Sequence, residues 1–339
     1  MITAAIAKLI SKADLTDAEM TGAMSSIMSG GISAVQMAAF LVAMRMKGET
    51  VEELTAAARV MRTMAQRLSV SPGDDEVLLD TCGTGGDGKD TFNISTIACF
   101  VNAAAGVKVA KHGNRSVSSS CGSADLMQAL GVNIEIPPAM VRECIRRVGM
   151  GFLYAPLFHS AMKHASPVRK EIAVRTIFNL LGPLTNPAMA PAQLVGVFDQ
   201  HLTETFARVL RNLGCAHALI VHGSDGLDEI TITGESRITE LNRQDMRTYS
   251  FHPQTLGMEL GRPSEITSRG VKDNVAICHE ILEGTKGARR NVVLLNSAAG
   301  LIAAGKASDF GQGMVMAADA IDSGRAKAAL DGLISFTNG

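Results

Sequence analysis

The chain has 339 residues and a formal net charge of -1, from 32 Lys and Arg against 33 Asp and Glu side chains. This length allows roughly two domains with a sizeable core, and a near-neutral chain offers no global field to attract nucleic acid or an anionic membrane. With no Trp and only 2 Tyr, the chain has few rings on which single-stranded nucleic acid stacks, so we expect a globular enzyme that binds neither nucleic acid nor membrane.

The apolar runs are too short for a membrane span, which needs ~20 residues. The first residues also lack a cleavable signal layout, because Lys8, Lys12 and Asp14 interrupt them. The six cysteines, at positions 82, 99, 121, 144, 215 and 278, form no CxxC pair. This pattern favours a reducing compartment without a zinc cluster, so we expect a cytoplasmic protein.

Residues 1 to about 68 are predicted to form an all-helical module. Apolar residues recur there at helical spacing, and Asp17 and Ser33 are candidate N-cap residues. The spacing is clearest for Ile2, Ile6, Leu9 and Ile10, and for Met37, Phe40, Leu41 and Met44. Residues 69–75 are polar and turn-rich, which predicts a hinge between this module and the rest of the chain.

From Val77 onward strands alternate with helices, a pattern that predicts an α/β fold with a mainly parallel sheet. Between residues 167 and 191 the pattern changes. We expect residues 168–181 to be helical, 182–187 to form a rigid turn, and this interval to pack on the helical module. Short antiparallel strands are expected at 229–233 and 237–241, and helices from Val271 to the end. The parallel strands are expected at 77–82, 107–111, 132–136, 151–155, 193–198 and 216–222.

A glycine-rich loop, CGTGGDGKDTFNIST at residues 82–96, follows the first of these strands and precedes a helix that Asn93 or Ser95 can cap. Strand, glycine loop and helix form a typical phosphate cradle. Glycines allow the backbone to approach a ligand closely, and the helix N-terminus directs free N–H groups and partial positive charge toward it.

Two nucleotide motifs nearly fit this loop. Gly83, Gly85 and Gly88 satisfy the dinucleotide pattern GxGxxG, but the next strand ends in Lys111, where an acid that binds the ribose is required. The P-loop pattern fails at Asp90, which replaces the hydroxyl that binds magnesium. A simple turn is the minority alternative, and we favour a phosphate loop of another kind.

A second polar loop, KHGNRSVSSSCGS at residues 111–123, follows the next strand and therefore opens at the same edge of a parallel sheet. Its cations, hydroxyls and glycines suit phosphate, although a solvated polar loop is the alternative. Asp228 and Glu229 follow the strand at 216–222. An Asp-Glu pair alone is usually a solvated turn, but beside two phosphate loops it favours Mg²⁺, which takes one or two protein carboxylates plus phosphate oxygens.

Other chemistry is less clearly marked. Arg169 is placed to bind a carboxylate with both ends of its guanidinium, although its basic neighbours also fit an ordinary solvated helix face. Neither a Ser-His-Asp spacing nor a pair of acids arranged for acid–base catalysis stands out. We therefore predict no protein nucleophile and name no catalytic residue.

Four segments resemble the anthranilate phosphoribosyltransferase family: GTGGDGKDTFNIST, KHGNRSVSSSCGSAD, HSAMKHASPVRKEIAVRTIFNLLGPLTNP and HGSDGLDEI. The resemblance extends along nearly the whole chain. It implies a small helical domain over residues 1–70, with about 165–190 packing on it, and a large α/β domain of the nucleoside phosphorylase/phosphoribosyltransferase type over 71–164 and 191–339. It also implies a homodimer that forms through the helical domains.

The resemblance further implies that the protein transfers the phosphoribosyl group of 5-phosphoribosyl 1-diphosphate (PRPP) to the amine of anthranilate, in tryptophan biosynthesis. Two Mg²⁺ ions per subunit would be held by Ser95, Asp228 and Glu229. Gly83, Asn114 and Arg169 would bind anthranilate, with His112 and His159 as weaker candidates nearby. The residues implied for PRPP are Gly83, Gly86, Asp87, Thr91, Asn93, Ile94, Ser95, Thr96, Lys111, His112, Gly113, Asn114, Arg115, Ser116, Val117, Ser118, Ser119 and Ser123.

The sequence does not depart from the family pattern at these positions. The nearest difference is Met127-Gln128, where the family often has an acid, and we expect it to lie outside the site. Two alternatives to the transferase remain. A pyrimidine nucleoside phosphorylase has a similar phosphate loop but no need of the Asp228 and Glu229 pair. A non-catalytic relative that binds nucleic acid would need a basic surface, whereas this chain is near neutral.

Overall fold

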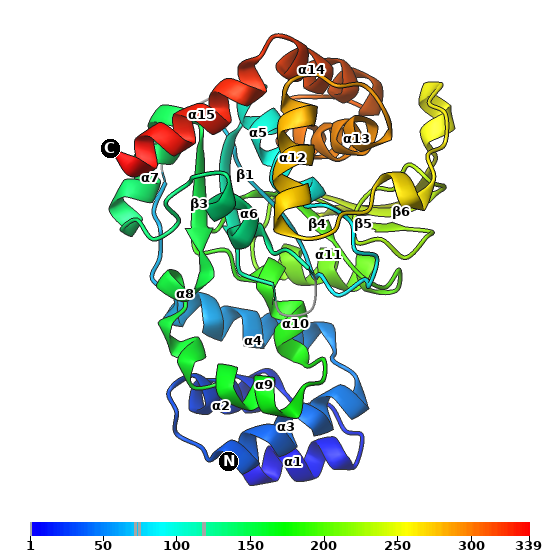
Figure 1. The fold of residues 1–339 in the computed structure, drawn as a ribbon. Coiled ribbons are helices and arrows are strands. Elements are labelled where there is room, and N and C mark those ends of the chain that lie inside the picture. Colours follow the sequence, from blue (N-terminus) through cyan, green and yellow to red (C-terminus); the bar gives the residue numbers. More distant parts are fainter. Residues whose placement is uncertain (1, 71–72, 74–75, 117–119) are drawn as a thin grey trace.

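The computed structural model describes residues 2–70, 73, 76–116 and 120–339, and its centre is one seven-stranded sheet (Figure 1). The strand order is β3-β2-β1-β4-β5-β6-β7. The first five strands are parallel to one another, β6 pairs antiparallel with β5, and β7 pairs antiparallel with β6. The strands are β1 (Leu78–Gly83), β2 (Lys108–Gly113), β3 (Met150–Tyr154), β4 (Ala192–Gly196), β5 (His217–Gly223), β6 (Ser236–Asn242) and β7 (Asp245–Phe251). The predicted α/β fold with a mainly parallel sheet is confirmed.

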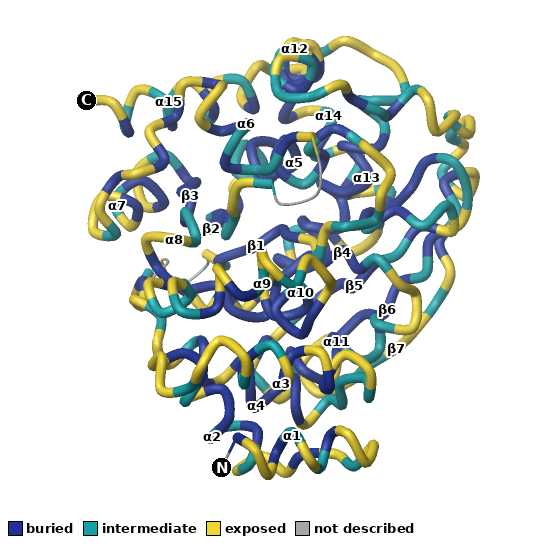
Figure 2. The backbone as a smooth tube through the Cα atoms, turned by 60° about the horizontal axis from the view of Figure 1, so that its bottom comes forward, coloured by how far each residue is buried: buried dark blue, intermediate teal, exposed yellow. Residues whose placement is uncertain are grey.

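Helices cover both faces of the sheet, which explains why its parallel strands are apolar runs buried along most of their length (Figure 2). One core contains Leu79 of β1 and Leu194 of β4 together with α5 (Ile94–Ala104), α6 (Ser123–Ala129) and the helices that follow the sheet. Those later helices are α12 (Val271–Leu282), α13 (Ala288–Ala303), α14 (Phe310–Asp322) and α15 (Arg325–Asn338), as predicted from Val271 onward. α7 (Pro138–Val148) packs beside β3.

The opposite face belongs to a second core, in which Val195 and Ile220 of the sheet meet α11 (Leu202–Asn212) and the N-terminal helices. The N-terminal helices are α1 (Ile2–Ile10), α2 (Asp17–Met28), α3 (Ala34–Lys47) and α4 (Val51–Met64). Residues from 165 to 184 join this same core through side chains such as Val168 and Phe178. The division of the chain into the two predicted domains stays a prediction.

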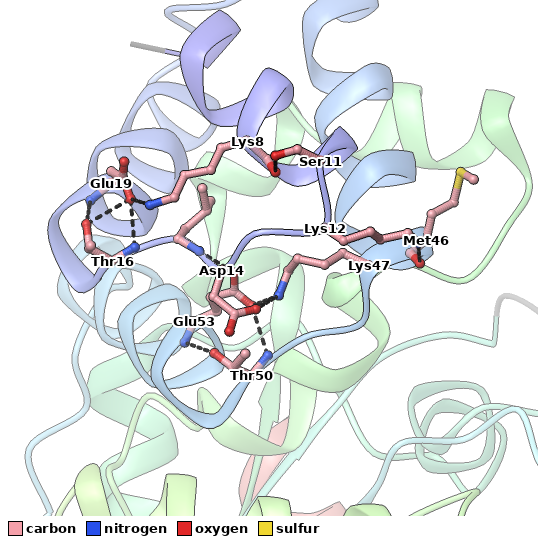
Figure 3. Close-up of polar contacts among 11 residues, drawn as sticks. Lys8, Ser11, Lys12, Asp14, Thr16, Glu19, Met46, Lys47, Thr50 and Glu53 are labelled. Atoms are coloured by element: carbon pink, nitrogen blue, oxygen red, sulfur yellow. Dashed lines mark hydrogen bonds and ion pairs between the residues drawn. The ribbon is translucent and has the colours of Figure 1, made fainter.

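A buried carboxylate holds the N-terminal helices together (Figure 3). Glu53, fully buried in the first turn of α4, accepts hydrogen bonds from the backbone N–H groups of Leu15 and Thr50, both at 2.9 Å. Lys47 lies 2.8 Å from Glu53 and 2.6 Å from Asp14. Because both charges of the Lys47–Glu53 pair are buried and bonded, removing either one leaves the other uncompensated.

Of the two predicted N-cap residues, one is correct and the other is displaced by one residue. Ser33 caps α3 by accepting from Gln36 N, as predicted, but the N-cap of α2 is Thr16 and Asp17 is the first helical residue. Thr16 and Glu19 form a complete capping box, which places the aspartate in the first turn, where its negative charge favours the helix dipole.

The strand predicted at 132–136 is wrong, because these residues form turns and irregular backbone between α6 and α7. Buried residues still alternate with exposed ones in this segment. Val132, Ile134 and Ile136 are buried, while Asn133 and Glu135 are exposed. The backbone here bonds to the C-terminal helix instead of a strand: Asn133 N donates to Thr337 Oγ1 at 3.2 Å.

The strand predicted at 229–233 is also wrong, and side chains take the hydrogen bonds that a neighbouring strand would supply. Asn296 of α13 accepts from Ile230 N and donates to Ile230 O, and Thr231 N donates to Ser236 Oγ. The strand predicted at 237–241 is present as β6. Its partner β7 was missed, because this edge strand is polar and largely exposed and gives no apolar signal.

The helix predicted over 168–181 is broken into α9 (Ser166–Ile172) and α10 (Ile177–Leu181). Ala173 takes a left-handed conformation with φ of 50° and ends α9, and Thr176 precedes α10 with its N–H bonded to Asn179 Oδ1. The predicted turn at 182–187 begins as a 3₁₀ helix, η2 (Gly182–Leu184). Arg62 of α4 donates to Leu184 O at 2.7 Å and so fixes this turn to the N-terminal helices.

The remaining elements are short connections. They are α8 (Ala155–Phe158), η1 (Ser160–Lys163), η3 (Pro253–Leu256) and η4 (Pro263–Glu265). The hinge predicted at 69–75 lies partly outside the described residues, which omit 71–72 and 74–75. No helix in the described part of the chain combines the length and apolar character that crossing a membrane requires.

Candidate active site

The glycine loop leaves the carboxyl end of β1, in the middle of the sheet, and leads into α5. Gly85, Gly86 and Gly88 have φ angles of 63°, 73° and 70°, a region that residues with a side chain rarely adopt. The run of glycines is therefore required by the backbone path. Adjacent parallel strands place the second loop, after β2, at the same edge.

Two further glycines make room for Asp228. A Cβ atom on Gly83 would lie 2.5 Å from Asp228 Oδ2, and one on Gly196, the last residue of β4, would lie 1.6 Å from the Asp228 carbonyl oxygen. Asp228 therefore packs directly over the ends of two neighbouring strands. Gly196 is not among the predicted site residues, because a single glycine at the end of a strand carries no signal for a distant loop.

The acid pair accepts hydrogen bonds from the backbone of the cradle. Gly85 N donates to Asp228 Oδ2 at 2.7 Å, and Ser95 N, in the first turn of α5, donates to Glu229 Oε1 at 3.1 Å. Carboxylate oxygens therefore occupy donors of the kind that bind the oxygens of phosphate. The structure brings the glycine loop, the start of α5 and the acid pair into one site.

Negative charge is concentrated here. Burial, with the neighbouring Asp87 carboxylate, raises the pKa of Asp228 to about 7, and burial, with Asp228, raises the pKa of Glu229 to about 8. Asp87 Oδ2 is buried with no hydrogen-bond partner among the described residues. Such a set of carboxylates is favourable only when protons or a cation compensate it.

These residues fit Mg²⁺ in particular. Within the described ranges, no three His, Cys, Asp or Glu side chains are grouped to hold a metal ion by themselves. Mg²⁺ does not need such a group, since it keeps several waters and shares the phosphates of its substrate. Two adjacent acids at the mouth of a phosphate cradle match that requirement.

Lys111, the first residue of the second loop, is hydrogen-bonded to β1 and to the start of α5. Its side chain is 2 % exposed, and Nζ donates to Thr81 O at 2.6 Å and to Ser95 Oγ at 3.4 Å. The cation thus lies beneath the start of α5, on the same face of the sheet, and its charge opposes the rise in the pKa of Glu229. Lys111, whose charge excluded a dinucleotide site, thus supports the phosphate loop from the protein interior.

The rest of the second loop is only partly drawn into the site. Arg115 donates to Tyr154 Oη, Asp125 Oδ1 and Gln128 Oε1, at 3.2, 3.0 and 2.8 Å, and so is bound to β3 and α6. Gln128, expected to lie outside the site, therefore contacts a candidate site residue. Asn114 O accepts from the N–H of Ala124. Val117, Ser118 and Ser119 lie outside the described residues, while Gly113 ends β2, Ser116 follows Arg115 and Ser123 begins α6.

The start of α5 is held by a residue that the sequence did not indicate. Asn93 is the N-cap by position, but its side chain makes no cap hydrogen bond. Instead, Asn274 Oδ1 of α12 accepts from Asn93 N at 2.8 Å and from Asn93 Nδ2 at 3.1 Å. The side chains of Ile94 and Thr96 are buried, so only their backbone is placed to meet a ligand. Thr91 forms an isolated bridge with Thr267.

Arg169, the predicted acceptor-binding residue, lies on α9. Its guanidinium carbon is 5.2 Å from the centre of the Phe178 ring, and burial lowers its pKa. In the described part of the chain, no hydrogen bond joins it to Gly83 or Asn114. His112 and His159 face each other with ring centres 5.1 Å apart, and burial lowers their pKa values to about 3 and about 4, so both rings are neutral at pH 7.

Comparison with known proteins identifies the family of the chain. A family model described as "Glycosyl transferase family, helical bundle domain" matches residues 3–65, and "Glycosyl transferase family, a/b domain" matches 75–327. Anthranilate phosphoribosyltransferase of Geobacter sulfurreducens is 53% identical over 100% of both chains. The Moorella thermoacetica protein of the same name is 52% identical over 99% of this chain and 98% of its own.

Solved structures of the same enzyme are also similar. The Thermus thermophilus protein has a TM-score of 0.92 at 42% identity and covers 99% of each chain. Two Saccharomyces cerevisiae structures cover 99% of this chain and 98% of their own: a complex with PRPP and Mg (TM-score 0.90, 27% identity) and one with 4-fluoroanthranilate (0.89, 26%). The chain belongs to the anthranilate phosphoribosyltransferase family.

Proposed function

We propose that this protein transfers the phosphoribosyl group of PRPP to the amine of anthranilate, giving N-(5-phosphoribosyl)anthranilate and diphosphate, in tryptophan biosynthesis. The observation that carries the proposal is the pair of backbone N–H groups, on Gly85 and Ser95, bonded to Asp228 and Glu229. Donors for phosphate and acids for a divalent cation thus meet at one sheet edge. The full-length relatives support the choice of substrates, and the comparisons support neither alternative activity.

The reaction breaks the bond between C1 of the ribose and the diphosphate oxygen, forms a bond from C1 to the amine nitrogen, and releases one proton from that nitrogen. An aryl amine is already neutral at pH 7, so it needs no strong general base. This fits the rings of His112 and His159, which are neutral at pH 7 and of which neither has to act as a strong base. The main task of the protein is then to stabilise the leaving charge and position the amine.

We assign the cation to Ser95, Asp228 and Glu229, with two Mg²⁺ ions per subunit. Support comes from the raised pKa values of the two acids. Burial and neighbouring carboxylates oppose the ionisation of these carboxyls, so a divalent cation bound beside them stabilises their charged form. When bound, Mg²⁺ supplies positive charge against the diphosphate as it leaves.

We assign PRPP to the loop residues named for it above and to the N–H groups at the start of α5. Gly83, Asn114 and Arg169 are assigned to anthranilate. Arg169 is the anchor in this set, because a guanidinium binds a carboxylate with two parallel hydrogen bonds and its burial on α9 strengthens such a pair.

We also propose that two copies of the chain form a homodimer through the helical module. α1 and α3 expose large apolar side chains: Val35 is 80% exposed, Ile10 70% and Met46 69%. Scattered apolar residues are common on surfaces, but three on neighbouring helices favour a partner. Sedimentation should give about twice the 35.6 kDa chain mass, and Val35→Glu with Met46→Glu should shift it to the monomer.

A cytoplasmic location is proposed on five of the cysteines. Cys82, Cys99, Cys144, Cys215 and Cys278 are free and buried, and burial raises the pKa values of the Cys144 and Cys278 thiols to about 12. Free thiols persist in a reducing compartment.

The decisive experiment follows anthranilate fluorescence in the presence of the pure, folded protein. Because the chain contains no Trp, its own emission is weak. Fluorescence should fall only when PRPP and Mg²⁺ are both present, and EDTA should stop the fall. No loss of fluorescence under these conditions would refute the function. Phosphate-dependent cleavage of uridine or thymidine would instead identify a nucleoside phosphorylase.

A further inference from the structure

Arg175 lies in the linker between α9 and α10, and none of the substrate or metal assignments above includes it. Ala173 ends α9 in a left-handed conformation, and α10 begins two residues after Arg175. The linker thus interrupts the helical run directly after the helix that carries Arg169. Arg175 itself is exposed, so its position does not result from burial in the core.

The guanidinium of Arg175 makes two contacts at the edge of the sheet. Nη2 donates a hydrogen bond to the carbonyl oxygen of Gly86, in the glycine loop. Its central carbon also lies 4.4 Å from the centre of the Phe198 ring, just beyond β4, which is a cation–π contact. One side chain from the α9–α10 linker therefore reaches both the loop after β1 and the segment after β4.

Phe198 is itself bonded to the loop. Its N–H donates to Thr84 Oγ1 at 3.1 Å, and Thr84 N donates to Gly196 O at 2.9 Å. β4 therefore fixes the loop at Thr84, and Arg175 fixes it two residues later. A Cβ on Gly86 would lie 2.9 Å from Arg175 Nη2, so a glycine at this position leaves the guanidinium its place.

We propose that Arg175 is a positioning residue that holds the glycine loop in its PRPP-binding shape and couples that loop to the α9 segment carrying Arg169. This inference rests on the proposed function. Arg169 and Arg175 lie on one short segment, so an acceptor that orders α9 also fixes the contact with Gly86. Coupling of this kind is reciprocal, and each substrate should strengthen the binding of the other.

Arginine suits this position better than lysine. Its flat guanidinium stacks on a ring while one N–H donates to a carbonyl, and an ammonium group cannot make both contacts with the same geometry. Arg175→Lys should therefore restore only part of what Arg175→Gln removes.

The test compares Arg175→Gln with Arg142→Gln, a matched change of an exposed arginine on α7. Arg175→Gln should raise the KM for PRPP about tenfold and change kcat less than about threefold, as expected when binding rather than chemistry is lost. Arg142→Gln should change neither constant. Thermal midpoints of both variants should match wild type, since both side chains are exposed. A fall in kcat at unchanged KM would overturn the proposal.

Coupling has its own measurement. In wild type, magnesium diphosphate should tighten anthranilate binding, measured by fluorescence titration, at least about threefold, and in Arg175→Gln this effect should vanish. Phe198→Leu added to Arg175→Gln should cost no further affinity, because both residues act through one contact. Equal coupling in wild type and variant, or none in wild type, would refute the proposal. Wild-type turnover in the same assays tests the proposed function separately.

Discussion

Gly196→Ala is the sharpest perturbation of this site, because its added Cβ would meet the backbone of Asp228. The added Cβ would lie 1.6 Å from the Asp228 carbonyl oxygen and 2.5 Å from its carbonyl carbon. Ordinary contacts of a Cβ begin at about 3.4 Å, so the backbone at residue 228 has to move by about 1.8 Å. Both partners are backbone atoms, and no side-chain rotation relieves the overlap.

Such a shift carries Asp228 away from Gly85 and displaces Glu229 beside it. A misplacement of about 1 Å in a catalytic arrangement costs about 100-fold in rate, so kcat/KM should fall at least about 100-fold and the Mg²⁺ titration should move to higher concentration. Gly83→Ala should displace Asp228 less, because its nearest atom, Asp228 Oδ2 at 2.5 Å, belongs to a side chain.

The assay is anthranilate fluorescence over a range of Mg²⁺ concentrations, with circular dichroism and the thermal midpoint as checks of folding. Gly182→Ala is the matched control. Gly182 has a helical φ of -50° and no atom within 4 Å of an added Cβ, so this variant should keep wild-type activity and stability. A folded Gly196→Ala protein with activity within about threefold of wild type and an unchanged titration would refute the reasoning about Asp228.

Three further outcomes are expected. Asp228→Asn with Glu229→Gln should lower turnover and weaken its Mg²⁺ dependence, which a magnesium titration measures. Arg169→Ala should raise the KM for anthranilate much more than the KM for PRPP; equal effects would indicate a structural role. Burial raises the pKa of Asp80, so ionising this group costs stability as pH rises above about 4. Asp80→Asn should therefore raise the thermal midpoint at pH 7, because the amide occupies the same fully buried position without a charge, and a thermal scan measures the change.

The parallel strands were predictable because each is a short apolar run followed by a polar loop, and those found lie within two residues of their expected bounds. The prediction failed where side chains replaced a neighbouring strand. At 132–136 alternation marked burial alone, and at 229–233 Asn296 satisfies the backbone from a position 66 residues away in sequence. Neither contact leaves a local signal, since both partners come from distant helices.

The site divides in the same way. The glycine loop, the helix start and the acid pair were predictable, because each is a local pattern at the end of a strand. Gly196, Asn274, Arg175 and Phe198 were not, because each acts by touching a loop distant in sequence. A single glycine, amide or ring has no periodicity or spacing of its own.

One consequence of the acid–amide contacts concerns the order of events at the site. The N–H groups of Gly85 and Ser95 are bonded to Asp228 and Glu229, so phosphate oxygens that bind these donors have to displace the carboxylates. Displaced carboxylates lose their donors while remaining buried, a cost that a cation bound to them offsets. Phosphate binding and cation binding are then parts of one exchange. We therefore expect diphosphate affinity to rise with Mg²⁺ concentration in wild type and to lose that dependence in the Asp228→Asn, Glu229→Gln double variant.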